Sequence, residues 1–522
     1  MAVISSAVKG QTNVSGGIYA NTTWTLANSP YIVTDTVVVF PGVTLTIQPG
    51  VLVKFADNQL LEIRQASLIA LGSLIQSITF TSNSSTPSAG SWNQIFLNGG
   101  NMPSKFNYCT FLYANTAINF KNSVVNTTFP HDSIIIKNSN FNYNNTGANF
   151  NGYGNSFQNN GIGIIDSCIF KNNINYGMII GVASAKVNNS NFSFNGTGLK
   201  GQGSTTNCIF NSNQTTGLQW GGPMTNCIIN SNQTGLAGSY IKANNCFIKN
   251  NQTGINSGSV NHFKNCSIDS NSVIGIIAND DSIINCSIRY NGQGIQSDVS
   301  VIIGNNIEYN SGGNIFDNSY NANGFAVIEG NTIQYGSVGI NNNLGHFTIT
   351  NNIIKYNDIG INLSRPNAAI SCNLICSNTT YDLKYGASAS INASHNYWCT
   401  SDSASIEAKI YDGYDNINYG LVTIMPIDTA NCNITTGIQI NQPHTFSFSI
   451  FPNPAINNLT LELPENISKT EIKIYNMLGE LEYAAEASKQ KTDIDISAFA
   501  GGLHVVQISS GESISRKKFI KQ

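Results

Sequence analysis

Four charged side chains recur at a regular spacing in the middle of the chain: Lys249, Asp269, Arg289 and Glu308 stand 19 or 20 residues apart. If the repeats stack as parallel strands, neighbouring members of this column lie about 4.8 Å apart. Alternating cations and carboxylates at that distance could bind an acidic polysaccharide and cleave it as a lyase or glycoside hydrolase, with Ca²⁺ as a cofactor of the lyase. The plainer alternative is an exposed ladder of ion pairs that contributes little to function.

Four tyrosines form a second column, each just before the asparagine or glycine of its repeat: Tyr290, Tyr309, Tyr335 and Tyr356. Exposed aromatic rings offer a large apolar surface with a polar tip, which suits contact with sugar rings. The alternation of side chains along a strand would instead point these rings toward the interior. The column therefore predicts either a ligand-binding surface for carbohydrate or a part of the core.

Two smaller groups could also do chemistry. Asp280 and Asp281 could act as the paired carboxylates of a glycosidase, although a solvated turn is the simpler explanation. A column of threonines could order water as an ice-binding face does, although it falls near a bend. These threonines are Thr197, Thr215, Thr234 and Thr253. The histidines lack the spacing of metal ligands, so no metal site is predicted.

These columns exist because the chain repeats itself. The segment Asn207-Cys208-Ile209-Phe210 has close copies that begin at Asn226, Asn245, Asn265 and Asn285. The cysteine and the apolar residue two positions later face the same side of a strand. One repeat cannot bury its own apolar face, whereas a stack of repeats forms a continuous core. The period predicts an all-β fold, a right-handed parallel β-helix.

The repeat predicts a column of cysteines in the core and a column of asparagines at a bend. The first holds buried cysteines that act as small apolar side chains. They are Cys168, Cys208, Cys227, Cys246, Cys266 and Cys286. Five residues after each first position stands an asparagine, replaced once by Gly336, which is expected to take a left-handed bend and to bond to its neighbours in a ladder. A disulfide is expected among the cysteines outside the column, which are Cys372, Cys376, Cys399 and Cys432.

Composition narrows the classes of partner. The chain has 522 residues, only 10% of them charged, and a formal net charge of −3. That overall balance gives no argument for binding to nucleic acid or to an anionic membrane. No apolar run is long enough to span a membrane. The first residues, Met1 to Ser6, lack the basic and apolar regions of a signal peptide.

Changes of pattern divide the chain into five parts. Residues 1–137 are expected to form an N-terminal cap with irregular coils, and residues 138–390 the regular coils. Residues 391–430, with Trp398 and a helix expected over Ser405 to Tyr411, should cap the far end. Residues 431–445 indicate a linker, and residues 446–522 an antiparallel β domain. An insertion near Asn314 to Gly324 is expected to project as a loop.

Residues 446–522 resemble the type A C-terminal sorting domain carried by cargo of the type IX secretion system in Bacteroidota. The resemblance rests on Ile450 to Ala455, Ile472 to Gly479, Gly501 to Ile508 and Arg516 to Lys521. It implies a small β-sandwich that contacts the secretion machinery, and so a secreted or outer-membrane surface protein. The sorting signal would then include Pro452, Asn453, Pro454, Gly479, Gly502, Lys517 and Lys518.

The two ends of the solenoid, with Pro41 to Ile47, Ile78 to Ser82 and Asn396 to Trp398, resemble those of right-handed β-helix repeat proteins from the same bacteria. The resemblance implies a pectate-lyase-like solenoid, a fold that supports lyases, hydrolases, adhesins and structural proteins alike. Because no acid–base cluster converges in the sequence, a non-catalytic protein that binds glycans or surfaces is the first hypothesis. A lyase or glycoside hydrolase for an acidic polysaccharide is the second, and ice binding is a third.

Overall fold

The protein forms two compact units, Met1–Ile434 and Thr435–Gln522, in the computed structural model. Their boundary falls within the predicted linker, which lies outside the described residues. The structure describes residues 10–99, 103–122, 133–152, 162–181, 184–298, 300–317, 325–343, 345–429, 448–463, 470–476, 481–487, 490–510 and 513–521.

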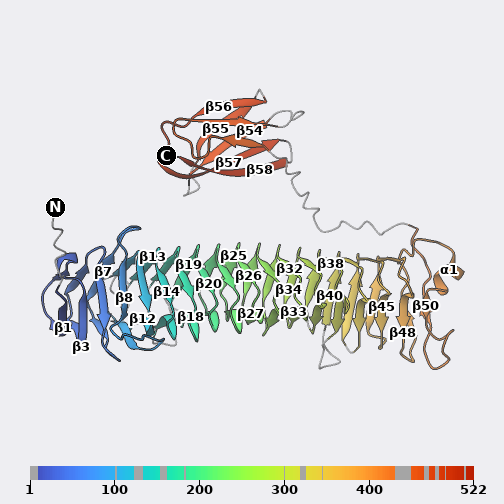
Figure 1. Ribbon diagram of the computed structural model, residues 1–522. Helices are drawn as coiled ribbons and strands as arrows, with labels where there is room; N and C mark the ends of the chain where they lie inside the picture. Colours follow the sequence, from blue (N-terminus) through green and yellow to red (C-terminus); the bar gives the residue numbers. More distant parts are fainter. Residues whose placement is uncertain are drawn as a thin grey trace. The chain divides into compact units, whose positions relative to one another are not determined.

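The first unit is a parallel β-solenoid whose strands stack in three ladders along one axis (Figure 1). Ladder 1 is a 16-stranded sheet, and the long strand β3 (Tyr31–Val39) links ladders 2 and 3 because its two halves pair with different strands. Ladder 1 runs from β2 (Thr22–Trp24) to β46 (Ala368–Ser371). Ladders 2 and 3 both begin with β1 (Thr12–Ile18) and β3; ladder 2 continues from β5 (Leu52–Phe55) to β47 (Leu374–Cys376), and ladder 3 from β6 (Leu61–Arg64) to β50 (Ile410–Tyr411). The predicted parallel β-helix is confirmed.

Each regular coil contributes one strand to each ladder, in the order 1, 2, 3, with short corners between the strands. Neighbouring coils pair in parallel and in register through all three ladders. The strands that carry the surfaces of interest are β17 (Ile169–Lys171), β18 (Tyr176–Ile180), β20 (Asn191–Ser193), β21 (Thr197–Gly201), β24 (Thr216–Gln219), β27 (Thr234–Gly238), β29 (Phe247–Lys249), β30 (Thr253–Ser257), β32 (Ser267–Asp269), β35 (Ser287–Arg289), β38 (Asn306–Glu308), β41 (Thr332–Gln334) and β44 (Ile353–Lys355).

Apolar side chains from all three ladders form one continuous core. In the earlier coils this core contains a column of phenylalanine rings whose neighbouring centroids lie 4.5 to 5.1 Å apart. The column consists of Phe80, Phe111, Phe141, Phe170, Phe192 and Phe210. From Ile229 onward isoleucine takes the same buried position. The second inward position predicted from the repeat is thus the centre of the core.

An asparagine ladder runs inside the corner between ladders 2 and 3. Asn213 Nδ2 donates to Asn232 Oδ1 at 2.9 Å and to the carbonyl oxygen of Phe192 at 3.0 Å. Where Gly336 interrupts the column, Asn314 fills the gap and donates to Asn357 Oδ1 at 3.1 Å. The side chain of Asn314 leaves no room for a Cβ at residue 336.

The prediction that these asparagines take the left-handed bend is wrong. The residue just before the asparagine has the positive φ, as at Ser212 (54°) and Tyr290 (55°). The bend turns that preceding side chain outward, while the asparagine stays inside the corner. There its amide can satisfy backbone groups of two coils that have no other partner.

A second column lines the corner between ladders 1 and 2. Seven buried cysteines with free thiols fall on it, and Cys109 extends the six that were predicted. Burial raises the pKa of the Cys168 thiol to about 12, so this thiol is a neutral apolar group. From Asn305 the same position holds asparagines that bond from coil to coil, through Asn331, Asn352 and Asn373.

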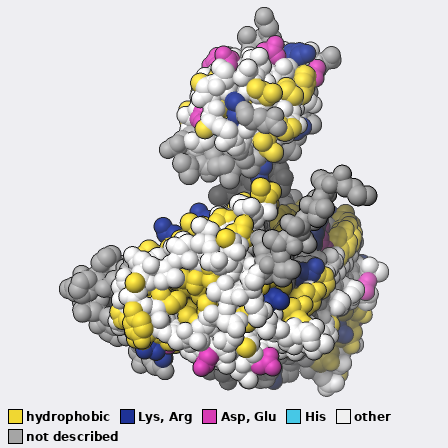
Figure 2. All heavy atoms as spheres, turned by 60° about the vertical axis from the view of Figure 1, so that its left-hand side comes forward, with side chains coloured by type: hydrophobic (Ala, Val, Ile, Leu, Met, Phe, Trp, Pro, Cys, Tyr) yellow, Lys and Arg dark blue, Asp and Glu magenta, His cyan; other side chains and the backbone are white. Residues whose placement is uncertain are grey.

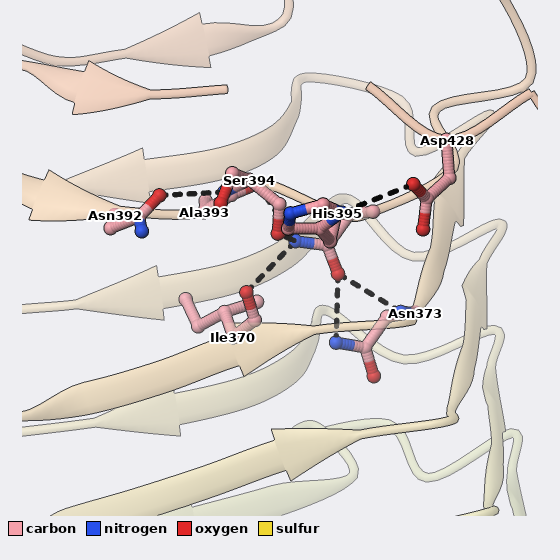
Figure 3. Close-up of polar contacts among 8 residues, drawn as sticks. Ile370, Asn373, Asn392, Ala393, Ser394, His395 and Asp428 are labelled. Atoms are coloured by element: carbon pink, nitrogen blue, oxygen red, sulfur yellow. Dashed lines mark hydrogen bonds and ion pairs between the residues drawn. The ribbon is translucent and has the colours of Figure 1, made fainter. Parts of the chain in front are cut away.

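Residues after 391 close the far end of the solenoid. Figure 3 shows the last bonds of the asparagine column, where Asn373 and the carbonyl of Ile370 each bond to Asn396, and His395 lies 3.4 Å from Asp428. A disulfide joins Cys376 to Cys399, which confirms the expectation of a bridge outside the column. The helix α1 (Ser403–Glu407) begins earlier than predicted and ends before Tyr411.

The predicted helix was too long because Ile410 pairs with Leu383 and adds the strand β50 to ladder 3. Among the described residues, no helix is both long and apolar enough to cross a membrane.

The second unit consists of two antiparallel sheets around a shared apolar core. One sheet contains β52 (Ser449–Phe451), β53 (Asn458–Glu462) and β56 (Lys491–Asp495), and the other β55 (Leu481–Ala487), β54 (Thr470–Tyr475), β57 (Gly502–Ser510) and β58 (Ser513–Lys521). Alternating residues such as Ile472 and Ile474 face this core. The antiparallel sandwich expected for this part is confirmed.

Candidate binding surfaces

The predicted charged column lies on the outward side of ladder 2. Register pairs Lys249 with Asp269, Asp269 with Arg289, and Arg289 with Glu308, so the four side chains do stand on successive coils. Among the described residues no salt bridge joins them, which contradicts the plain ion-pair ladder. Instead, Ser270 Oγ donates to Asp269 Oδ1 at 2.8 Å, and the Arg289 guanidinium lies 5.8 Å from the ring centroid of Tyr290.

The predicted tyrosine column is an exposed stack at the corner between ladders 2 and 3. The four side chains are 41% to 54% exposed, so the alternative of inward rings is wrong. Neighbouring ring centroids lie 5.2, 4.4 and 5.4 Å apart, with nearly parallel planes. Each tyrosine occupies the left-handed corner position, with φ between 54° and 58°. These tyrosines are Tyr290, Tyr309, Tyr335 and Tyr356.

This stacking decides which part of the tyrosines a ligand can reach. The inner rings cover one another's faces, and Lys355 Nζ lies 4.9 Å from the centroid of the last ring, Tyr356. Ring edges and hydroxyls therefore form the accessible strip. Desolvation and the neighbouring Tyr335 raise the pKa of Tyr309, so its hydroxyl stays protonated and can donate a hydrogen bond.

The two smaller predicted groups do not form the sites that their residues suggested. Asp281 is only 3% exposed and accepts hydrogen bonds from the Asn261 and Asn279 backbone nitrogens. The predicted solvated carboxylate is therefore found at Asp280 and not at Asp281. Burial raises the pKa of the Asp281 carboxyl. In the threonine column, the register on ladder 3 aligns Thr216 with Thr234, while the hydroxyls of Thr215 and Thr197 hydrogen-bond to each other at 2.8 Å.

A cluster on ladder 3 has no counterpart among the residues predicted from the sequence. The ammonium group of Lys200 lies 5.5 Å from the ring centroid of Tyr176 and 5.0 Å from that of Trp220. Trp220 is 54% exposed and has a φ of 60°, a conformation that few bulky residues adopt. Gly238 makes room for the indole, since a Cβ there would lie 2.8 Å from Trp220 Cδ1. Nearby, Lys171 Nζ lies 5.3 Å from the centroid of the exposed Phe194.

A local count of charges would have pointed to this cluster. From Ser167 to Ile268 the sequence contains six lysines and no Asp or Glu, a segment we name the basic coils. From Asp269 to Asp358 it contains eight acidic residues against Arg289 and Lys355, and we name this segment the acidic coils. Because these two segments have opposite charge, the net charge of −3 for the whole chain reveals neither of them. Figure 2 shows how sparse charged side chains are on the visible face of the solenoid, where apolar side chains lie among uncharged polar ones.

In the second unit the two ends of the predicted sorting signal meet. Asn453 Oδ1 accepts from the backbone nitrogen of Ile520 at 2.9 Å, and Asn453 Nδ2 donates to the carbonyl of Lys518 at 3.2 Å. The motif around Pro452 and Pro454 is thereby held against β58, next to Lys517. Gly502, on β57, pairs with Lys521 of β58. Gly479 lies outside the described residues.

Residues 449–522 match the family model of the secretion system C-terminal sorting domain. This agrees with the predicted sorting domain and indicates export to the cell surface or secretion. The protein is thus an exported β-solenoid with a C-terminal sorting domain.

An ulvan lyase of Nonlabens ulvanivorans is 25% identical over 80 residues. The match spans 15% of this chain and 15% of the lyase, far less than two thirds of either.

Several solved structures are similar in outline. The mannuronan C-5 epimerase AlgE6 A-module of Azotobacter vinelandii is 15% identical, with 65% of this chain and 90% of that one covered and a TM-score of 0.27. The periplasmic alginate epimerase AlgG is 10% identical, with 61% and 79% covered and a TM-score of 0.28. A tailspike of Acinetobacter baumannii bacteriophage Fri1, a capsular polysaccharide depolymerase, is 10% identical, with 93% and 73% covered and a TM-score of 0.20. At such TM-scores these likenesses carry no argument about function.

Proposed function

We propose that the protein is an exported, non-catalytic β-solenoid that binds glycans. The observation that carries the proposal is the stack from Tyr290 to Tyr356: four exposed aromatic side chains held at one corner of successive coils. A contiguous row of exposed aromatic side chains is a feature that often marks a binding site. The left-handed backbone at each of them belongs to the corner of the regular coils, as at Phe194 and Ser212, and it holds the rings on the outside of that corner.

The stack suits a chain of sugar residues better than a single ring. Its hydroxyls are repeated donors along the solenoid axis, and the ring edges are apolar surface between them. The rigid core beneath the corner keeps the rings in place without a ligand, so little ordering entropy is lost on binding.

Binding of the full chain to immobilised polysaccharides tests the proposal. The double variant Tyr309→Ala, Tyr335→Ala is expected to lower affinity for the retained polysaccharide about tenfold. Tyr143→Ala is the matched control, because Tyr143 occupies the same corner with a φ of 57° but lies outside the stack. Failure of the wild-type chain to bind any polysaccharide would contradict the proposal.

A second candidate is a lyase or glycoside hydrolase for an acidic polysaccharide. It is favoured by the buried Nε of Arg289, which has no hydrogen-bond partner and stands between Asp269 and Glu308 in the charged column. Arg289 and Lys249 would neutralise the substrate's carboxylate, Asp269 or Glu308 would move the proton, and Ca²⁺ would be the cofactor. Release of unsaturated products or new reducing ends, lost in Arg289→Ala and Asp269→Ala, would establish this activity and displace the non-catalytic proposal.

The partner of the second unit is proposed to be the type IX secretion machinery. Asn453 ties the beginning of the sorting domain to its last strand, so Asn453→Ala should loosen the surface that the machinery reads. The fraction of the protein recovered outside the cells should fall. Asn457→Ala, a change in the same domain away from this junction, is the control.

A further inference from the structure

We propose that the basic coils bind an anionic sugar residue on ladder 3, with its ring against Trp220 and its carboxylate or sulfate on Lys200. This inference rests on the proposed glycan binding and adds to it the charge class of the ligand and a site apart from the tyrosine stack. The site combines one cation, two aromatic rings and an uncharged strand surface in three successive coils.

The cation lacks a carboxylate partner. Among the described residues no acidic side chain forms a salt bridge with Lys200, and no Asp or Glu occurs anywhere from residue 167 to 268. The rings of Tyr176 and Trp220 hold the ammonium group in place without neutralising its charge. An ammonium group has three hydrogen-bond donors, and ring faces do not satisfy them as a carboxylate or sulfate would.

The aromatic part of the site is a single exposed indole rather than a closed stack. The faces of the inner tyrosines are covered by their neighbours, whereas Trp220 contacts Lys200 and the backbone near Gly238 and remains 54% exposed. An indole that is both exposed and fixed by a left-handed corner offers a preorganised platform for a sugar ring.

The floor beside the cation is flat and uncharged. Register aligns Lys200 with Gln219 and Gln219 with Ala237, so small or amide side chains follow the lysine along ladder 3. Thr216 and Thr234 form the neighbouring outward column and add hydroxyl groups. The amide and hydroxyl groups of these side chains can bond to sugar hydroxyls.

The distribution of lysines favours an acidic polysaccharide over a nucleic acid. The six lysines are spread over all three ladders, with Lys171 and Lys249 on ladder 2, Lys200 on ladder 3, and Lys186, Lys242 and Lys264 on ladder 1. A nucleic-acid surface needs several cations along one continuous strip to neutralise neighbouring phosphates. Here each cation beside an aromatic ring is separate, as in the pair Lys171 and Phe194.

Affinity of the full chain for polygalacturonate, carrageenan and the neutral glucan laminarin tests the proposal. Lys200→Gln is expected to weaken binding to the anionic polysaccharides about tenfold and to leave laminarin binding unchanged. Trp220→Ala should weaken binding to all polysaccharides that the site accepts, and Lys200→Arg should restore the anionic preference. Lys384→Gln, which removes a cation 5.7 Å from the ring centroid of Tyr411, outside both the basic coils and the tyrosine stack, should change affinity less than twofold.

The alternative outcomes separate this site from the general proposal. If Lys200→Gln and Trp220→Ala keep wild-type affinity while the tyrosine double variant loses it, the site is wrong and glycan binding stands. If the wild-type chain binds no polysaccharide, both proposals fall. If duplex DNA or RNA binds more tightly than carrageenan and depends on Lys200, the sugar assignment is wrong. An unchanged thermal unfolding midpoint for each variant shows that folding does not account for the result.

Discussion

The basic coils and the acidic coils are built on the same repeat and differ in where their aromatic side chains lie. In the basic coils the phenylalanine column, including Phe170, Phe192 and Phe210, is inside the core. Isoleucine fills that position from Ile229 onward, still within the basic coils, and in the acidic coils a tyrosine column stacks outside. The interior accepts either residue because both are large apolar side chains that are fully buried at this position. The comparison teaches that the repeat determines the core, while charge and aromatic placement on the outside vary from region to region.

The corner between ladders 1 and 2 differs between these regions as well. Cys246 stands in a column of thiols, whereas Asn352 accepts hydrogen bonds from both nitrogens of Asn331 and donates to the carbonyls of Ile328 and Thr350. Thiols fill space, but amides also satisfy backbone groups. The stability of the acidic coils should therefore depend more strongly on this corner than the stability of the basic coils does.

The largest expected difference is between the two aromatic columns. Phe192→Ala should lower the free energy of unfolding by about 3–5 kcal/mol, because a buried ring leaves a cavity between its neighbours. Tyr309→Ala should cost less than about 1 kcal/mol, because the ring is exposed at the surface. Urea unfolding measures both, and equal losses would contradict the assignment of one column to the core and the other to the surface.

The corner column should give the next largest difference. Asn352→Ala removes the side-chain hydrogen bonds that join this amide to Asn331, Asn373 and the carbonyls of Ile328 and Thr350, and it should cost about 2–4 kcal/mol. Cys246→Ala removes only one sulfur atom from the core and should cost about 1–2 kcal/mol. Urea unfolding of the two variants measures both losses in free energy. A larger loss for Cys246→Ala would show that the thiol column contributes more to stability than the amides do.

A smaller effect should distinguish the cations of the two regions. Lys171→Glu places a carboxylate beside Phe194 in the basic coils and should weaken carrageenan binding about threefold by repulsion. Lys355→Glu makes the same change beside Tyr356, where the surroundings are already acidic, and should leave affinity nearly unchanged. Raising the salt concentration should abolish the difference. Equal weakening by both substitutions would mean that charge acts over the whole solenoid.

The smallest effect concerns the buried carboxyl at the start of the acidic coils. Because burial raises the pKa of Asp281 in the folded state, the carboxyl favours folding when protonated. That contribution is present below its ordinary pKa of about 3.9 and is lost as the pH rises through the raised value. Asp281→Asn should remove this part of the pH dependence, measured by unfolding between about pH 4 and pH 7. The exposed Asp280→Asn should leave it intact, and identical profiles for both variants would contradict the burial effect.

Much of the architecture could be predicted from the sequence, because periodicity reports directly on which side chains share a face. The spacing of Cys208 and Phe210 and their copies identified the inward positions, and Cys376 and Cys399 were among the four cysteines expected to form a disulfide. The spacing in the sequence also predicted which residues are neighbours in the outward column from Lys249 to Glu308, and the strand register agrees. In each case a fixed number of residues per coil converts sequence distance into spatial contact.

Features that depend on the geometry of a corner could not be obtained in this way. The repeat does not tell which of two adjacent residues, Tyr290 or Asn291, takes the left-handed conformation, and that choice decides which side chain is exposed. Nor does it tell that Asp281, next to an exposed Asp280, turns inside to accept hydrogen bonds. Backbone bonding between coils makes these choices, since an unpaired buried group is costly.

By itself, the sequence determined the stack, its inward columns and the sorting domain at its end. Only the tertiary structure decided that the tyrosines cover one another's faces and that Lys200 reaches rings in the coils on both sides of its own. The physical reason is that contacts between coils join residues about twenty positions apart through side-chain reach and direction. Period alone sets the register of such residues, whereas the corners set where their side chains point.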